Sequence, residues 1–213
     1  MLLAVGWVIR VPLLSRAEGH EAITRAAWQD LSLTDVQQQA LIRGVRAPDA
    51  GLVGVLVSAL PFAQPRHALR AWSGTTTARG IRDMREFLAA CHARALAIPE
   101  GHRRWAAFGE VLHCLQDSYS PAHTDRAGAL IVRMKHWGPL DGLRRTDEHG
   151  FPTDGRDGAL LNGILTDEAH AAVAASRCYL EIALRQCASD ESEAARRHAL
   201  GAFLDEVVPE STD

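Results

Sequence analysis

The chain has 213 residues, which is long enough to bury a sizeable hydrophobic core, and we expect one domain over residues 1–213. Hydrophobic residues make up 47% of it and charged residues 23%, which is ordinary for a soluble globular protein. The formal net charge of −3 gives no sign of the basic surface that nucleic-acid-binding proteins use. The ten histidines stand out, because zinc sites draw on imidazole.

The apolar segment at residues 1–9 is too short to cross a bilayer, and Arg10 and Pro12 interrupt it early. A secretory signal needs a basic beginning and a longer apolar stretch, so we expect a packed N-terminal segment instead. No other stretch predicts a transmembrane helix. Four cysteines without a CxxC pair leave the compartment open between exported and cytoplasmic. Cys178 and Cys187 stand nine apart on an expected helix, about 13 Å, which argues against a disulfide between them.

Helical spacing of apolar residues recurs along most of the chain. It predicts helices over residues 15–31, 34–45, 78–97, 103–119, 160–187 (broken or started near Thr166) and 192–207. Ser15, Thr34 and Thr77 are the expected N-caps of the first three, and Gln37 completes a capping box with Thr34. The sequence therefore predicts an all-α fold, a single compact multi-helix domain with few or no strands.

Two segments depart from this spacing. Residues 51–60 are strongly apolar and fit a buried helix or a strand equally well. Residues 124–158 are rich in glycine and show little periodicity. A loop of that length inside a compact domain usually has a function. We therefore expect a long site-bearing loop between the central helix and the C-terminal helices.

The central helix carries the strongest chemical signal, in residues 109–123. His113 and Asp117 are four residues apart and share one helix face, and His123 follows after Pro121, which is expected to end the helix. Gly109, one turn before His113, is expected to leave room beside the imidazole. A neighbouring face predicts core: Trp105, Phe108, Leu112, Leu115 and Tyr119. Imidazole and carboxylate suit zinc, although His113 and Asp117 alone could also be an ion pair on a solvated face.

Three segments that precede the central helix extend this pattern: Gly19-His20-Glu21-Ala22-Ile23-Thr24, Ala47-Pro48-Asp49 and Pro65-Arg66-His67. They are followed by the central motif His113-Cys114-Leu115-Gln116-Asp117-Ser118-Tyr119-Ser120-Pro121-Ala122-His123. In this order they resemble the zinc-dependent phospholipase C superfamily, which includes the fungal single-strand-specific nucleases. The HxxxDx5H unit is the most specific part of the resemblance, which covers residues 19–123. It implies an all-helical protein with two to three zinc ions.

The resemblance also implies roles for individual residues. His67, His113 and Asp117 would hold one zinc ion, and Asp117 would bridge to a second ion held with His20. Asp49, counted among the metal-site residues, would orient or deprotonate the attacking water and is the expected catalytic residue. His123 would hold a third ion together with later ligands. Paired metal ions clamp the attacking and leaving oxygens of a phosphodiester.

The sequence departs from the family pattern in three places. Trp7 stands at a suitable distance before His20, but it would have a free amine only if residues 1–6 were removed, and whether it becomes the N-terminus is left open. The gap from Asp49 to His67 is longer than in the family. The later His-xxx-Glu is absent, since Leu140 stands where the carboxylate should follow His136 and Asp141 comes next. The late ligand is left open among His136, His149 and His170, whereas His92, His102 and His198 are expected to be surface or satisfied helix histidines.

The resemblance favours a zinc-dependent phosphodiester hydrolase that acts on phospholipid headgroups and touches a membrane peripherally. The first alternative is the same chemistry on single-stranded nucleic acid or nucleotides, with a positive groove formed by Arg70, Arg126, Arg133, Lys135 and the Arg144-Arg145 pair; the net charge disfavours it. The second is a non-catalytic binding module with an incomplete metal cluster, supported by the missing tryptophan amine and late carboxylate.

Overall fold

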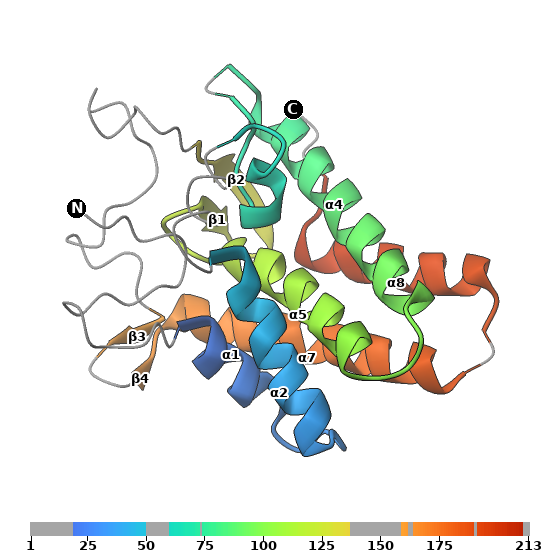
Figure 1. Cartoon of the computed structure of the whole chain (residues 1–213). Helices are drawn as coiled ribbons and strands as arrows, with labels where there is room; N and C mark the ends of the chain where they lie inside the picture. The colour runs from blue at the N-terminus through green and yellow to red at the C-terminus, as the bar shows by residue number, and fades with distance from the viewer. Residues whose placement is uncertain are drawn as a thin grey trace.

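A computed structural model describes residues 19–49, 60–72, 74–136, 159–161, 164–189 and 191–210. The described chain is all-α, as the sequence predicted, with two small two-stranded ribbons added (Figure 1). The α-helices are α1 (Gly19–Trp28), α2 (Asp35–Arg46), α4 (Thr77–Ala97), α5 (His102–Asp117), α7 (Asp167–Ala188) and α8 (Glu193–Val207). Two short 3-10 helices, η1 (Ala47–Asp49) and η2 (Gln64–His67), connect them.

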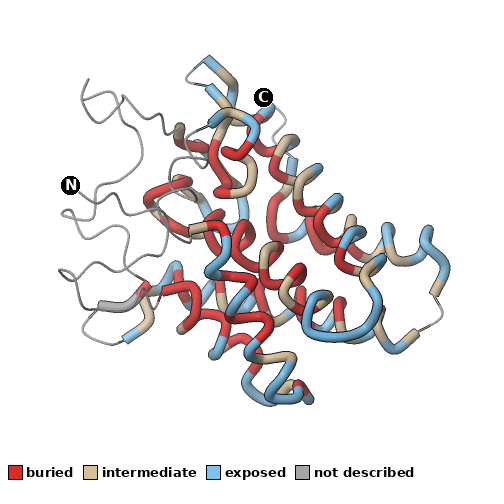
Figure 2. The backbone as a smooth tube through the Cα atoms, viewed as in Figure 1, coloured by how far each residue is buried: buried red, intermediate tan, exposed pale blue. Residues whose placement is uncertain are grey.

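Helix α5 is the centre of the bundle. It packs against α2, α4 and α7, while α1 lies on α7 and α2, and α8 lies on α7 and α4. Figure 2 shows the buried residues concentrated along α5 and on the faces that turn toward it. Trp105, Phe108, Leu112 and Leu115 are all buried, and Tyr119 is half-buried against the same core, which confirms the predicted inward face.

Local sequence signals explain where most helices begin. Thr34 caps α2 through the predicted capping box, with the Gln37 backbone N–H donating to Thr34 Oγ1 and the Thr34 backbone N–H donating to Gln37 Oε1 at 2.7 Å. Thr166 and Ser192 cap α7 and α8 in the same way. The predicted cap of α4 was wrong by one residue, because Thr76 accepts from the Arg79 N–H and Thr77 is already helical. Ser15 and the segment 51–59 lie outside the described residues.

The end of α5 differs from the prediction. The helix stops at Asp117, four residues before Pro121, because Ser118 Oγ donates to the Leu115 carbonyl at 2.7 Å and the chain tightens into successive turns. These turns carry the chain back toward α5, so His123 comes close to the last turn of the helix. The proline is therefore part of the returning loop and does not itself end the helix.

Part of the expected loop is regular. Strands β1 (Thr124–Ala127) and β2 (Leu130–Met134) pair antiparallel around Gly128, whose φ of 63° suits a tight turn. Residues 137–158 lie outside the described residues. Strands β3 (Leu160–Leu161) and β4 (Ile164–Leu165) form a second short ribbon in the first part of the expected helix. The helix itself begins at Asp167, directly after its N-cap Thr166, which confirms the alternative of a start near Thr166.

Hydropathy within the described ranges identifies no helix that combines the length and apolarity needed to cross a bilayer. The four cysteines all fall in described helices and all are free thiols, so Cys178 and Cys187 are not bonded to each other, as predicted.

Candidate metal centre

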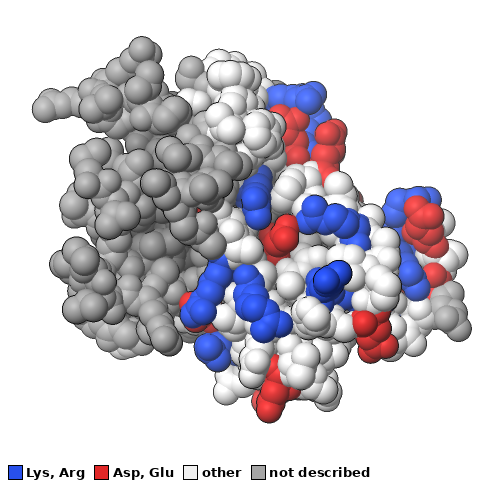
Figure 3. All heavy atoms as spheres, in the orientation of Figure 1, with Lys and Arg blue, Asp and Glu red and all other residues white. Residues whose placement is uncertain are grey.

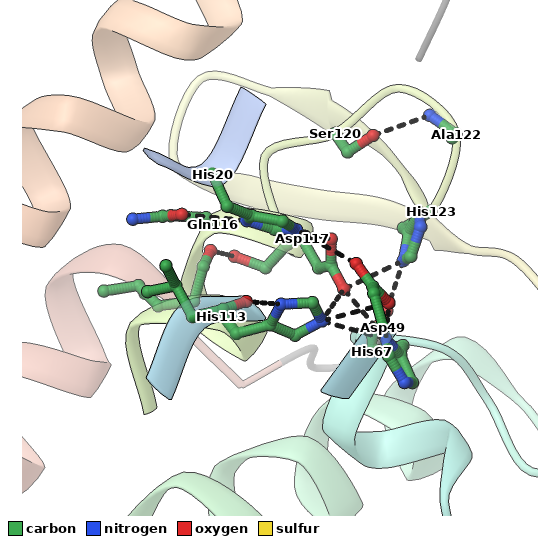
Figure 4. Close-up of polar contacts among 12 residues, drawn as sticks. His20, Asp49, His67, His113, Gln116, Asp117, Ser120, Ala122 and His123 are labelled. Atoms are coloured by element: carbon green, nitrogen blue, oxygen red, sulfur yellow. Dashed lines mark hydrogen bonds and ion pairs between the residues drawn. The ribbon is translucent and has the colours of Figure 1, made fainter. Parts of the chain in front are cut away.

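Six side chains from five segments meet at one place, which we call the His/Asp cluster (Figure 4). They are His20 of α1, Asp49 of η1, His67 of η2, His113 and Asp117 of α5, and His123 of the turn after α5. All are buried except Asp49, whose side chain is 13% exposed. The structure thus brings together every site residue that the sequence predicted between positions 20 and 123.

Close packing of α2 on α5 positions His113. A Cβ atom on Gly109 would lie 2.5 Å from the Leu41 carbonyl oxygen, so only glycine fits at this crossing. The predicted reason for Gly109 was therefore wrong: it admits the backbone of α2 and not the imidazole. The end of α2 then comes so near α5 that His113 Nδ1 donates to the Val45 carbonyl at 2.8 Å. In the neutral ring this bond leaves His113 Nε2 without a proton and directed into the cluster.

Helix η2 presents His67 to α5. Cys114 Sγ donates to the Pro65 carbonyl at 3.1 Å, which ties the beginning of η2 to α5. Ala68, directly after His67, adopts the left-handed conformation with φ of 50° and is fully buried. A non-glycine residue pays about 1 kcal/mol there, and such strain is found most often at functional sites.

Asp117 is the centre of the cluster. Its Oδ2 lies 3.1 Å from His113 Nε2 and 3.2 Å from His67 Nδ1, and these two imidazole nitrogens are 3.0 Å apart. Its Oδ1 lies 3.3 Å from His20 Nε2 on the other side. One carboxylate therefore faces two separate groups of imidazoles, which is the arrangement expected of a bridging ligand.

Asp49 closes the cluster from η1. Its Oδ1 lies 3.7 Å from His67 Nδ1 and 3.8 Å from His113 Nε2, and its Oδ2 lies 3.8 Å from His20 Nε2. These separations are too long for hydrogen bonds, but they leave the space between the side chains small. Two sets of three residues present their ligand atoms within 4.8 Å of one another: His20, His113 and Asp117, and Asp49, His67 and His113.

His123 lies at the edge of the cluster. Its Nδ1 donates to the His67 carbonyl and is 3.7 Å from Asp117 Oδ2, so in the neutral ring its Nε2 carries the lone pair. Lys135 fixes this turn, because its backbone N–H donates to the His123 carbonyl at 2.8 Å and its Nζ donates to the Pro121 carbonyl. His123 belongs to neither set of three, in keeping with its expected place at a different ion.

The cluster contains buried polar atoms that no group in the described part of the chain satisfies. His20 Nε2, Asp49 Oδ1 and Asp117 Oδ1 have no hydrogen-bond partner, although each is buried. An unsatisfied buried polar atom costs about 1–3 kcal/mol, and native proteins rarely tolerate several together. Divalent cations would satisfy buried atoms of this kind, and imidazole nitrogen with carboxylate oxygen is the donor set that zinc takes.

The electrostatics of the cluster also call for positive charge. Burial alone would raise the pKa of Asp117, but the surrounding His123 and His113 hold it well below its usual range. Burial alone would lower the pKa of His113, yet the carboxylates of Asp117 and Asp49 outweigh it and raise that pKa to about 9. Burial lowers the pKa of His123. Near neutral pH the metal-free cluster therefore keeps a proton on His113, and a cation would take its place.

Of the three predicted late ligands, the two in the described part of the chain belong to neither set of three. His136 follows β2, is half-buried and belongs to neither set of three. His170 is exposed on α7, which is unfavourable for the third-ion role considered for it. His149, Leu140, Asp141 and Trp7 lie outside the described residues.

The remaining histidines behave as predicted. His92 is buried, with its two ring nitrogens bonded to Tyr179 Oη at 3.0 Å and Gln186 Oε1 at 2.8 Å. His102 and His198 are exposed. Sequence reasoning missed Gln116, whose Oε1 lies 2.8 Å from His20 Nδ1. A glutamine on the inward face of a core helix was the available signal.

The His/Asp cluster, and not similarity to a known protein, is what bears on function here. No protein-family model, no curated protein and no solved structure matches the chain. The resemblance of its motifs to the zinc-dependent phospholipases C therefore stays a prediction.

Proposed function

We propose that this protein is a zinc-dependent phosphodiester hydrolase that acts on phospholipid headgroups. The observation that carries the proposal is the meeting of six histidine and aspartate side chains around buried atoms with no hydrogen-bond partner. A structural histidine cluster would be expected to satisfy its own polar atoms, as His92 does with Tyr179 and Gln186. The His/Asp cluster does not, which favours a bound cation.

The donor geometry suggests how the ions would be divided. His67, His113 and Asp117 Oδ2 would hold one ion, and His20 with Asp117 Oδ1 would hold its neighbour. Zinc bound there would polarise a phosphoryl oxygen and lower the pKa of bound water. His123 would serve a further ion through Nε2, because its Nδ1 is committed to the His67 carbonyl.

Asp49 is the residue suited to take a proton from the attacking water. Its side chain is the most exposed of the cluster, at 13%, while the other five are at most 6% exposed. Its two oxygens face His20 on one side and His67 on the other, at 3.8 and 3.7 Å. A carboxylate in that place can orient a water between the two halves of the cluster and accept its proton.

We favour lipid over nucleic acid because two cations of the predicted groove are engaged within the fold. Arg70 donates to the carbonyls of Met134 and Thr75, both at 2.9 Å. Arg126 donates to the Ser118 carbonyl at 2.7 Å and to the Val207 carbonyl at 3.0 Å. These two cations of the predicted groove stabilise the fold, and Arg144 and Arg145 lie outside the described residues. Figure 3 shows Lys and Arg interspersed with Asp and Glu on the visible described face.

The test is hydrolysis by zinc-loaded protein and by its Asp49→Asn variant. We expect release of a phosphorylated headgroup from phospholipid vesicles, no cleavage of single-stranded DNA, and loss of turnover in the variant with its melting temperature retained. Asp83→Asn is the matched control, because Asp83 pairs with Arg79 on the surface of α4 at 2.8 Å. Full turnover in Asp49→Asn would overturn the assigned role of Asp49. Cleavage of DNA in place of lipid would identify the nuclease alternative, and no hydrolysis at all would favour the binding module.

A further inference from the structure

Gln116 connects three helices beside the His/Asp cluster. Its side chain is fully buried on α5, directly before Asp117. Its Oε1 lies 2.8 Å from His20 Nδ1 of α1 (Figure 4). Its Nε2 lies 2.9 Å from Thr24 Oγ1 of α1 and 3.3 Å from Ser176 Oγ of α7.

The structure places the Gln116 amide with its nitrogen toward two hydroxyl groups and its oxygen toward His20. The Nε2 group has two protons, and the Thr24 and Ser176 hydroxyl oxygens provide one acceptor for each. The amide oxygen is then turned to His20, where only a donor can satisfy it. His20 Nδ1 must therefore carry the proton of the neutral ring.

The other nitrogen of His20 supports the same assignment. If Nε2 carried the proton, it would have to donate to a carboxylate, yet His20 Nε2 and Asp117 Oδ1 both remain without a hydrogen-bond partner. They lie 3.3 Å apart. A lone pair on Nε2 directed into the cluster agrees with this arrangement.

We propose that Gln116 is a positioning residue, which holds His20 in the Nδ1-protonated tautomer and so keeps His20 Nε2 available to a metal ion. The role rests on the proposed metal centre. Outer partners of this kind orient a ligating imidazole and typically change metal affinity by about 10–100-fold.

Comparison within the cluster shows why Gln116 is informative. His113 Nδ1 and His123 Nδ1 also donate to carbonyl oxygens, but these belong to the backbone, at Val45 and His67. Of these three imidazoles, His20 is the one whose partner is a side chain, so its tautomer can be changed by a single substitution. Through Ser176 the same amide also brings α7, which contributes no residue to the His/Asp cluster, into contact with the centre.

The first test is the tautomer of His20 in the full chain after metal removal. Long-range proton–nitrogen NMR correlations of the imidazole rings would be recorded near pH 8, above the ordinary histidine pKa of about 6.5, with His20 assigned by its loss in His20→Gln. We expect a protonated Nδ1 and an unprotonated Nε2. An Nε2-protonated or doubly protonated ring would overturn the proposal, and this measurement needs no variant of Gln116.

The second test is zinc affinity, measured by competition with a chromophoric chelator. Gln116→Leu is expected to weaken binding at the tightest site by about 10–100-fold, and Gln116→Glu, which keeps an acceptor for His20, is expected to restore most of it. Gln186→Leu is the matched control, because Gln186 is also buried and its Oε1 accepts from His92 Nε2 at 2.8 Å. This pair is separate from the His/Asp cluster. It should lower stability and leave zinc affinity unchanged.

The outcomes separate the two proposals. Unchanged zinc affinity in folded Gln116→Leu, or an equal loss in Gln186→Leu, would overturn the positioning role and leave the hydrolase proposal in place. Wild-type protein that binds zinc but hydrolyses nothing would overturn the hydrolase proposal. The tautomer of His20 and the loss of zinc affinity in Gln116→Leu would still support the positioning role of Gln116. Failure of the wild type to bind zinc would overturn both.

Discussion

Gly109 and Gly44 are in backbone contact: a Cβ atom added to either residue would lie 2.7 Å from the Cα atom of the other. This contact sets the distance between α2 and α5 where Val45 accepts from His113. The geometry of the candidate metal centre therefore depends on a helix crossing outside it, in which the absence of two side chains is the essential feature.

Gly109→Ala is expected to destabilise the protein by about 1–3 kcal/mol or more, because the new methyl group meets the Leu41 carbonyl at 2.5 Å and backbone cannot move aside as a flexible side chain can. Urea unfolding at fixed pH measures the change. Gly201→Ala is the control, since Gly201 lies within α8 with nothing near its added Cβ and should gain up to about 1 kcal/mol. Equal stabilisation by both substitutions would contradict the close crossing.

Protein purified without chelator is expected to contain two to three zinc ions per chain, measured by inductively coupled plasma mass spectrometry. Zinc added to the chelator-treated protein at about 100 times the dissociation constant should stabilise it by about 2.7 kcal/mol, or about 5–10 °C in melting temperature. Magnesium is the control cation, since it prefers oxygen ligands. One ion per chain would indicate an incomplete metal cluster. No ion, together with a melting temperature that zinc does not change, would overturn the metal assignment.

Asp117→Asn is expected to lose zinc more severely than Asp49→Asn. Asp117 lies within 3.3 Å of His20, His67 and His113, whereas Asp49 stays at least 3.7 Å from each of them. We expect affinity to fall more than about 100-fold for Asp117→Asn, beyond the range of an outer-shell change, and less for Asp49→Asn. Competition titration of both variants measures this. The reverse order would show that Asp49 and not Asp117 is the bridging carboxylate.

His92 should make the protein more sensitive to acid. Burial lowers its pKa; the hydrogen bond to Gln186 opposes this shift and the charge of Arg196 adds to it. The unfolded chain accepts a proton near pH 6.5, while the folded chain resists it. The stability contributed by the neutral ring is therefore fully present above about pH 6.5 and is lost as the pH falls through the lower pKa of the folded state.

Replacement of His92 by glutamine, which cannot be protonated, tests this dependence. Between about pH 7.5 and 5.5, the free energy of unfolding should fall by up to about 1.4 kcal/mol more in the wild type than in His92→Gln. Urea titrations would be made with chelator in every sample, so that the His/Asp cluster contributes equally to both proteins. Parallel curves for the two proteins would contradict the buried, neutral state of His92.

Much of the fold was predictable because its signals are local. The capping box of Thr34 and Gln37 and the inward face of α5 follow from spacing within one helix. The ribbon at residues 124–134 was missed because its strands are short, although Gly128 and the β-branched Ile131 and Val132 indicate a turn and a strand. The close contact of Gly44 with Gly109 pairs residues far apart in sequence, so no local pattern predicts it.

The members of the candidate site were predictable from motif order, but their orientation was not. The resemblance named His20, Asp49, His67, His113, Asp117 and His123, and the fold brings all six together. Which ring nitrogen of each histidine faces the cluster depends on carbonyl groups from other segments, such as Val45 and Gln116. Those partners are set by tertiary packing, which a single sequence does not display.

Helix α1 has only ten residues, fewer than an isolated helix needs to persist in water, and His20 is its second residue. A metal ion shared by His20 and Asp117 would attach the beginning of α1 to the end of α5. Without the ion, α1 would then open locally at temperatures well below the one at which the whole bundle unfolds. Backbone amides of α1 would exchange with solvent in step with zinc occupancy, so this short helix would report the metal content of the protein.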